Sequence, residues 1–208
     1  MVLASGSPQR RAILAQVGIR FEVRRPDVEE LTAGEPAAVA EENARRKARA
    51  TASALWASLS RPTASPPADA SPAAASPSPL GDLVLGADTV VAIDGEILGK
   101  PRDPAQARAY LSRLAGRTHD VVGGVALASR ERGMRSFVEV TRVRFRALGD
   151  ELLDWYVGTG EWRSRAGGYA IQGAGAALVA GIEGDYLNVV GLPLARLLDE
   201  GFAAHLGA

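Results

Sequence analysis

The sequence predicts an α/β fold built on a mixed sheet, and three observations lead to this prediction. Apolar runs of strand length alternate with longer stretches of helical composition along most of the chain. Residues 83–93 (LVLGADTVVAI) form a nearly continuous apolar run, which is typical of a strand buried on both faces. No repeat of about 20–50 residues is visible, which argues against solenoid and propeller folds.

The first part of the chain is expected to contain two short strands and two helices. Ser7 is a residue type that caps helices, Pro8 suits the first helical turn, and Gly18 is a typical stop signal. A later stretch rich in Ala, Glu and Arg predicts a long helix. The expected strands are 2–5 and 21–25, and the expected helices are 8–17 and 36–59.

After the buried apolar run, Asp94 and Gly95 predict a hairpin turn. Asp103 is a capping residue type, and Gly116 marks the end of the helix that follows it. The remaining expected elements are a hairpin strand at 96–98, helices at 104–115 and 150–159, strands at 121–129, 135–146, 169–171 and 177–182, and a last helix from 194.

One segment, residues 60–79, differs sharply in composition from the rest. It holds six of the twelve prolines, and alanine is its only aliphatic residue type. Such a segment cannot bury enough apolar surface to offset its ordering entropy. We therefore expect a single domain over residues 1–208 with a flexible or partly polyproline-II insertion at 60–79. The insertion is either a tolerated loop expansion or a docking tether.

Composition excludes several classes of function. The 24 Lys and Arg balance the 24 Asp and Glu, so a broad basic surface for a nucleic acid polymer is not expected. There is no cysteine and there are only two histidines, which excludes disulfides, thiolate nucleophiles and multi-histidine metal sites. No apolar stretch reaches the length of about 18 residues typical of a membrane helix. The lack of cysteine agrees with a cytoplasmic protein.

Polar clusters stand where folding alone does not require them. Ser5, Ser7 and Arg10 lie where a strand ends and a helix begins, and the free N–H groups of a helix N-terminus suit a phosphate group. The alternative is an ordinary helix cap with solvated arginines. On the long helix, Asn43 and Lys47 are four residues apart and share a face, which alone is a weak signal.

The central cluster contains the best single candidate for chemistry. Asp88 interrupts the buried apolar run, and a buried carboxylate without a partner is costly. We therefore expect Asp88 to lie at a strand end or in a cleft, facing a cation, as a metal ligand or general base. Lys100, between Gly99 and Pro101, is placed to direct its ammonium group at a phosphate.

A late cluster brackets an apolar strand with glycines. Within it, Gln172 could read the edge of a base through paired hydrogen bonds, or it could be a strand-end glutamine bound to backbone. His119 and His205 are interpreted as structural or surface residues.

Six segments together resemble the Maf-type nucleotide pyrophosphatases and occur in the same order. They are LASGSPQRRAIL (3–14), EENARRKARA (41–50), VLGADTVVAIDGEILGKPRD (84–103), LAGRTHDV (114–121), RAGGYAIQG (165–173) and NVVGLPL (188–194). The resemblance covers nearly the whole chain outside residues 57–80. It implies a cytoplasmic enzyme that cleaves nucleoside triphosphates between the α and β phosphates and uses Mg²⁺ or Mn²⁺. It also implies an elongated, twisted mixed sheet flanked by helices with a cleft between two lobes, as in the inosine-triphosphate pyrophosphatases, and commonly a homodimer.

Roles follow from this resemblance position by position. The matched residues are Ser5, Ser7 and Arg10 for phosphate, Glu30 and Asp88 for metal, Arg10, Lys47, Asp88 and Lys100 for catalysis, and Gln172 in the late motif. The pattern around Thr89 and Gln172 is that of the dTTP/UTP-preferring branch, which implies that both lie near the base. Two positions depart from the family pattern: Gln9 replaces an arginine at a position that varies with base preference, and Arg165 replaces a lysine.

The chemistry expected from the residues agrees with this activity. A triphosphate needs several cations, which Arg10, Lys47, Lys100 and a divalent metal would supply. Asp88 would activate a water for attack on the α phosphorus or hold the metal, and Glu30 would assist with the metal. Two alternatives remain: a nucleotide-binding regulator of septum formation that does not turn over, and a phosphohydrolase that releases orthophosphate.

Overall fold

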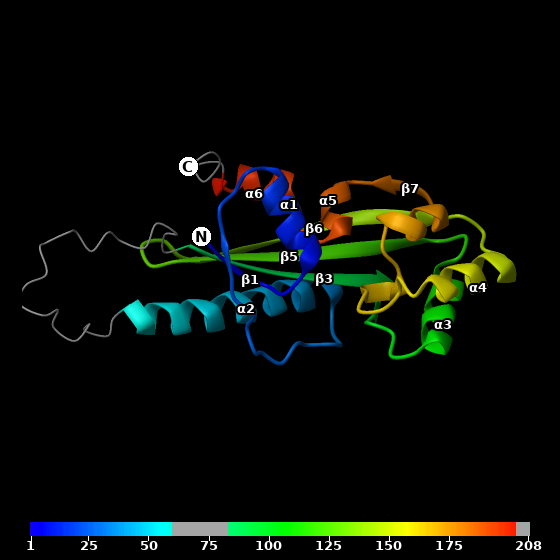
Figure 1. Cartoon of the computed structure of the whole chain (residues 1–208), viewed down its shortest axis with the longest axis horizontal. Coiled ribbons are helices and arrows are strands. Elements are labelled where there is room, and N and C mark those ends of the chain that lie inside the picture. The colour runs from blue at the N-terminus through cyan, green and yellow to red at the C-terminus, as the bar shows by residue number, and fades with distance from the viewer. Residues whose placement is uncertain (60–82, 203–208) are drawn as a thin grey trace, which may run out of the picture.

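The computed structural model describes residues 1–59 and 83–202, and its centre is a seven-stranded mixed sheet (Figure 1). The strands are β1 (Val2–Ala4), β2 (Glu22–Val23), β3 (Val84–Ile93), β4 (Glu96–Leu98), β5 (Thr118–Ser129), β6 (Gly133–Phe145) and β7 (Val179–Glu183). The helices are α1 (Pro8–Gln16), α2 (Pro36–Leu59), α3 (Pro104–Leu114), α4 (Asp150–Thr159), α5 (Tyr186–Val190) and α6 (Leu194–Asp199), with short 3₁₀ helices η1 (Ala166–Gly168) and η2 (Gly173–Leu178).

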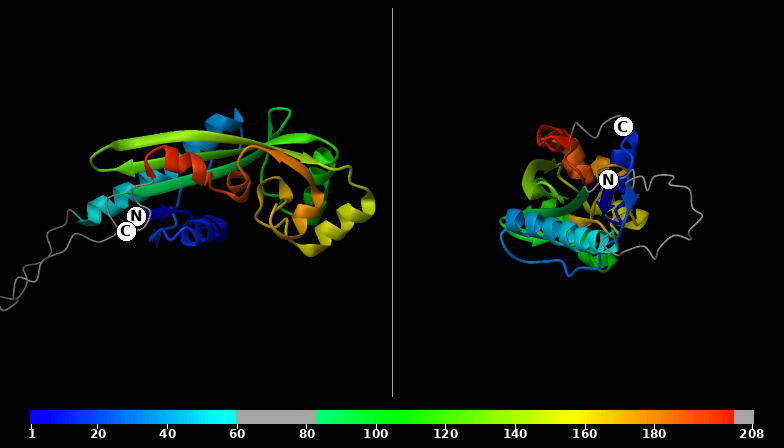
Figure 2. Two further views of the ribbon diagram at one scale, coloured as in Figure 1. Left: turned by 90° about the horizontal axis from the view of Figure 1, so that it is seen from above. Right: turned by 90° about the vertical axis from the view of Figure 1, so that its left-hand side faces the viewer.

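The strands follow the order β2-β1-β3-β5-β6-β7, with β4 paired to β3. β1 is parallel to β2 and β3, whereas β3, β5, β6 and β7 pair antiparallel. The long strands β5 and β6 give the molecule its elongated shape (Figure 2). α2 covers one face of the sheet, α1, α5 and α6 lie on the other, and α3 and α4 gather at one end (Figure 1).

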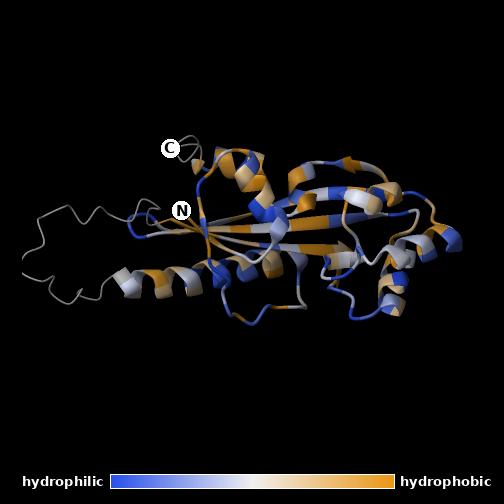
Figure 3. Ribbon diagram, in the orientation of Figure 1, coloured by the Kyte–Doolittle hydropathy of each residue, from blue (hydrophilic) through white to orange (hydrophobic). Residues whose placement is uncertain are grey.

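The two faces of the sheet have separate hydrophobic cores because side chains alternate along each strand. Leu3, Leu85 and Val125 pack beneath α1 and α6, while Val2 and Val84 pack against α2. A third cluster joins α3 and α4 to the far ends of the strands. Hydrophobic residues accordingly follow the strands in Figure 3.

Small residues let α2 lie unusually close to the sheet. A Cβ atom on Gly86 would be 2.3 Å from the carbonyl oxygen of Ala44, and one on Gly124 would be 2.1 Å from that of Ala40. The helix backbone therefore rests directly on β3 and β5. This close approach brings the polar residues of α2 within reach of the carboxylate of Asp88 on β3.

The predicted fold class and most element positions are confirmed. β3 is buried on both faces, as its apolar run indicated. The expectation of a strand at 169–171 is wrong, because glycines on both sides turn this segment into an irregular connection between η1 and η2. The 3₁₀ helix η2 extends to Leu178, so β7 starts at Val179 and not at residue 177 as predicted. The short helix α5 was not predicted.

Two of the expectations concern residues that the structure does not describe. The insertion at 60–79 and His205 lie outside the described residues. Among the helices of residues 1–59 and 83–202, none combines the length and apolar character needed to cross a bilayer.

Candidate functional site

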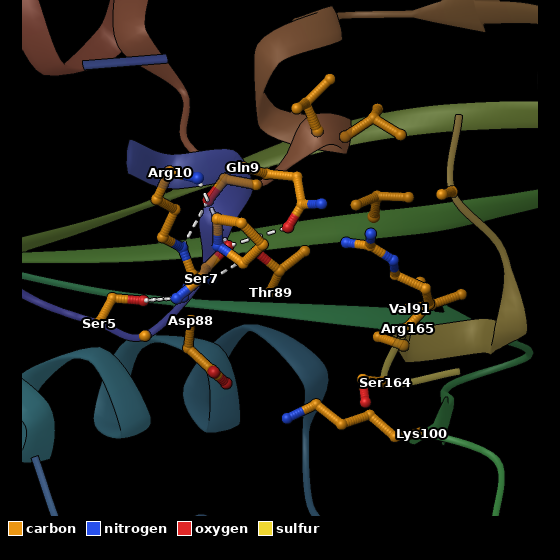
Figure 4. Close-up of a pocket in the computed structure, with 18 of the residues that line it drawn as sticks. Ser5, Ser7, Gln9, Arg10, Asp88, Thr89, Val91, Lys100, Ser164 and Arg165 are labelled. Atoms are coloured by element: carbon orange, nitrogen blue, oxygen red, sulfur yellow. Dashed lines mark hydrogen bonds between the residues drawn. The ribbon is translucent and has the colours of Figure 1, made fainter. Parts of the chain in front are cut away.

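A pocket of about 530 Å³ opens above β3, between the start of α1 and the segment 163–172 (Figure 4). Ten residues singled out from the sequence line it together. They are Ser5, Ser7, Gln9, Arg10, Glu30, Lys47, Asp88, Thr89, Lys100 and Gln172. Residues separated by more than a hundred positions in the chain thus share one cavity.

The first wall is built by the turn into α1. The Ser7 hydroxyl accepts from the backbone N–H of Arg10, which caps the helix. The buried guanidinium of Arg10 donates from Nε to the Gly191 carbonyl (2.8 Å), from Nη1 to Ser5 Oγ (2.9 Å) and from Nη2 to Thr89 Oγ1 (3.0 Å). Burial lowers the pKa of Arg10, although nearby carboxylates oppose this. Two of its five N–H groups remain for a ligand.

The floor of the pocket holds a compact ionic cluster. Asp88 lies within β3, in a cleft and facing a cation, which is one of the two placements expected for it. Lys47 Nζ lies 2.7 Å from Asp88 Oδ1 and 2.6 Å from Glu30 Oε1. Asn43 Nδ2 donates to the other oxygen, Asp88 Oδ2, at 3.0 Å. Asn43 and Lys47 thus share one face of α2, as their spacing predicted.

Lys47 offsets one of the two negative charges in this cluster. Burial opposes the ionisation of Glu30, but the hydrogen bond and charge of Lys47, with two further cations, outweigh it and lower the pKa of Glu30. Glu30 also lies 3.8 Å from the ammonium of Lys100, a side chain 62% exposed at the mouth of the pocket. Lys47 therefore bridges two carboxylates, while Lys100 makes one longer ion pair and remains exposed to an incoming ligand.

A divalent metal would find two carboxylates here, those of Glu30 and Asp88. Within the described residues no group of three or more His, Cys, Asp or Glu side chains could hold a metal ion. Magnesium commonly takes one or two carboxylates and completes its coordination with phosphate oxygens and water. The donor set thus fits a hard cation that arrives with a phosphate ligand.

The opposite wall is the segment 163–172, whose backbone is unusual. Ser164 has φ of 61°, and Gly167 and Gly168 also have positive φ. The N–H of Gly167 donates to the carbonyl of Gly99 at 3.1 Å, which ties this wall to the turn that carries Lys100.

Buried aromatic side chains hold the same wall in place. The Tyr156 hydroxyl accepts from the backbone N–H of Ala170 (3.1 Å), and the Tyr169 hydroxyl lies 2.8 Å from His119 Nε2. Burial lowers the pKa of His119 to about 4, so its ring is neutral at pH 7. His119 is structural, as expected. Gln172, at the end of this wall, is exposed, and its side chain makes no hydrogen bond to a described residue.

Sequence reasoning missed part of the pocket's charge. Arg25 and Arg163 also line it, as does Arg165, which was noted only as a departure. Arg25 packs over Gly6, and the guanidinium of Arg163 stacks on the Trp162 ring at 4.8 Å. No spacing rule would have found either, because both lie in irregular segments. Six cationic side chains and two carboxylates line the pocket, while the whole chain has a net charge of zero.

The chain is similar to several known proteins. The model of the Maf-like protein family matches residues 1–200. A dTTP/UTP pyrophosphatase of Symbiobacterium thermophilum is 48% identical over 200 residues, which cover 94% of this chain and 89% of the relative. A dTTP/UTP pyrophosphatase of Myxococcus xanthus is 48% identical over 196 residues, covering 93% and 87%. The solved nucleoside-triphosphatase, or dITP/XTP pyrophosphatase, of Mycobacterium abscessus covers 98% of this chain and 96% of its own at a TM-score of 0.48 and 15% identity.

Proposed function

This chain belongs to the family of Maf-like proteins, and from this premise we propose that it is a nucleoside triphosphate pyrophosphatase. It hydrolyses the α–β phosphate bond of dTTP, UTP or modified pyrimidine nucleotides and releases a nucleoside monophosphate and pyrophosphate. Its relatives are named for this activity, which favours an enzyme of the nucleotide pool over a regulator of septum formation.

The observation that carries the proposal is the charge of the pocket. Four more cations than carboxylates line a cavity that is large enough for a nucleotide. Such a surplus at one place in a neutral chain favours a polyanionic ligand. The carboxylate of Asp88 at the floor of this pocket can act as a base for hydrolysis, which a site that only binds phosphate does not need.

Asp88 is the proposed base that activates the attacking water. Each of its oxygens already accepts one hydrogen bond, from Lys47 or from Asn43. A carboxylate oxygen accepts two, so one position on each oxygen is free for water. Asn43 and Lys47 fix the orientation of the carboxylate. Lys47 also offsets the negative charge that would repel the incoming phosphates.

Arg10 and Lys100 bind the triphosphate, with the hydroxyls of Ser5 and Ser7 beside them. Arg10 is pre-oriented by its three hydrogen bonds, so it loses little freedom on binding. Such fixed cations stabilise the charge that develops as the α–β bond breaks. Lys100 is exposed and free to reach the outgoing pyrophosphate.

Gln9, Thr89 and Gln172 lie near the base. The Gln9 carbonyl accepts from the Ser7 hydroxyl at 3.3 Å, which turns its amide N–H₂ toward the pocket as a donor. Thr89 Oγ1 accepts from Arg10, so a base-proximal residue is bonded to a phosphate-binding one. Donors facing the carbonyl groups of uracil or thymine account for a preference for these bases.

Mg²⁺ or Mn²⁺ is the proposed cofactor, held by Glu30 and Asp88. When bound, it would neutralise phosphate charge and polarise the bond that breaks. The remaining proposals are a cytoplasmic location, a single domain over residues 1–208 and a homodimer.

The test is a release assay with dTTP, UTP, CTP, GTP, 7-methyl-GTP and modified uridine triphosphates. Each is incubated with Mg²⁺ or Mn²⁺, and pyrophosphate is separated from orthophosphate. Repeated release of pyrophosphate per protein from dTTP or UTP supports the proposal. Saturation at one nucleotide per protein without product would identify a sensor, and orthophosphate as the product would identify a phosphohydrolase.

A further inference from the structure

Arg165 differs from the other pocket arginines in having a buried guanidinium nitrogen that lacks a hydrogen-bond partner. Its Nε atom is buried without a hydrogen-bond partner, and its guanidinium forms no hydrogen bond or ion pair with any described residue. By contrast, Arg10 makes three side-chain hydrogen bonds, and Arg163 stacks on Trp162. In Figure 4 the Arg165 side chain points from its wall into the space that Gln9 faces from the other side.

A half-buried cation without a partner is unfavourable in the free protein. Removing a charge from water costs free energy that only a counter-charge or several hydrogen bonds recover. Here the neighbouring charges worsen the balance, because the pocket already contains more cations than carboxylates. The arrangement is therefore suited to a ligand that brings negative charge.

The backbone around Arg165 is held in a fixed, costly conformation. Ser164, the residue before it, has φ of 61°, a region that non-glycine residues seldom adopt. The segment that follows is anchored at Gly167 by the Gly99 carbonyl and at Ala170 by the Tyr156 hydroxyl. These contacts fix the backbone from which the Arg165 side chain projects, and they do not neutralise its charge.

We propose that Arg165 binds a phosphate group of the nucleotide, from the wall opposite Arg10. The inference rests on the proposed function, since it assigns a further residue to the same substrate. A guanidinium donates two parallel N–H groups to phosphate oxygens, which an ammonium cannot do. The arginine at a position where the family pattern has lysine thus gives a geometrically defined contact. The triphosphate is then held between cations of both walls.

The experiment measures binding rather than turnover, by calorimetry in the presence of Mg²⁺. The probes are inorganic triphosphate and a UTP analogue with a non-hydrolysable α–β bridge. Arg165→Gln is expected to weaken the binding of both by about 10- to 100-fold, the size typical of a lost charge-assisted contact. Arg165→Lys keeps the charge without the paired donors and should fall between.

Arg163→Gln is the matched control, since it removes one positive charge from the same wall at a residue that already has a partner. It should weaken binding of either probe by less than Arg165→Gln does. Unchanged circular dichroism and melting temperature establish that the variants fold.

Two results would overturn the assignment. If Arg165→Gln leaves the affinity for inorganic triphosphate unchanged but weakens the UTP analogue, Arg165 contacts the base or sugar. If neither affinity changes, or if Arg163→Gln has an equal effect, Arg165 contributes only general charge or nothing. Pyrophosphate release by the unmodified protein is scored separately, so failure of the proposed function is distinguished from failure of this inference.

Discussion

Replacing Asp88 by Asn removes the proposed base while keeping nearly the same shape. The amide presents one acceptor and one donor in place of two acceptors, so either the Lys47 or the Asn43 contact is lost. Lys47 keeps its other carboxylate partner, Glu30, at 2.6 Å. A single lost hydrogen bond at a buried site costs about 1–3 kcal/mol of stability, which lowers Tm by several degrees without unfolding the protein.

The effect on turnover is expected to be much larger than the effect on stability. General-base assistance contributes about 10²–10⁴-fold, so kcat for UTP should fall at least about 100-fold. The assay is pyrophosphate release at saturating UTP and Mg²⁺, at a temperature well below the Tm of the variant. Asp120→Asn makes the same chemical change at an exposed residue that does not line the pocket and serves as the control. A loss in kcat of less than about tenfold for Asp88→Asn would refute its role as the base.

Three further predictions follow from individual contacts. Gly86→Ala places a Cβ 2.3 Å from the Ala44 carbonyl oxygen, so α2 must shift. We expect the free energy of unfolding, measured by denaturant melts, to fall by about 1–3 kcal/mol, and most of the activity to be lost. The control Gly158→Ala has open space around the new Cβ and should not destabilise the protein. Equal stabilities of the two variants would contradict the close packing of α2. Burial lowers the pKa of His119 from 6.5 to about 4 in the folded protein. Between pH 6.5 and 4 the His119 ring is therefore protonated more readily in the unfolded chain than in the folded one, so the free energy of unfolding falls as the pH drops through this range. Denaturant melts should show that the unmodified protein loses about 2 kcal/mol more than His119→Gln between pH 7 and 5, and equal losses would disprove this effect. Lys100→Ala should raise KM for UTP about tenfold and leave Tm nearly unchanged, since this side chain is 62% exposed; an unchanged kcat/KM would remove Lys100 from the site.

Much of the fold could be predicted from the sequence because its signals are local. The apolar run of β3, the proline and serine at the start of α1 and the composition of α2 each depend on a few neighbouring residues. Most of the ten site candidates could be identified because polar residues stood at positions that folding did not require, whereas Gln9, Glu30 and Thr89 were identified through the resemblance to the family. Their presence in one pocket is a result of the structure.

The remaining features depend on contacts between distant residues. The spacing of Asn43 and Lys47 predicted a shared face but not that Lys47 bridges Asp88 and Glu30. That contact requires Gly86 to let α2 approach the sheet, which no local pattern reveals. The apolar residues at 169–171 indicated a strand. The glycines with positive φ on both sides and the Tyr156 hydroxyl that binds the Ala170 N–H instead give this segment an irregular path.

Attack of water on the α phosphorus can be tested by turnover in water enriched in oxygen-18. UTP and Mg²⁺ are incubated with the unmodified protein, and the products are separated and analysed by mass spectrometry. We expect one labelled oxygen in UMP and none in pyrophosphate. Label in pyrophosphate would place the attack on the β phosphorus, and UDP with labelled orthophosphate would mean that a different bond is cleaved. Either result would contradict attack on the α phosphorus.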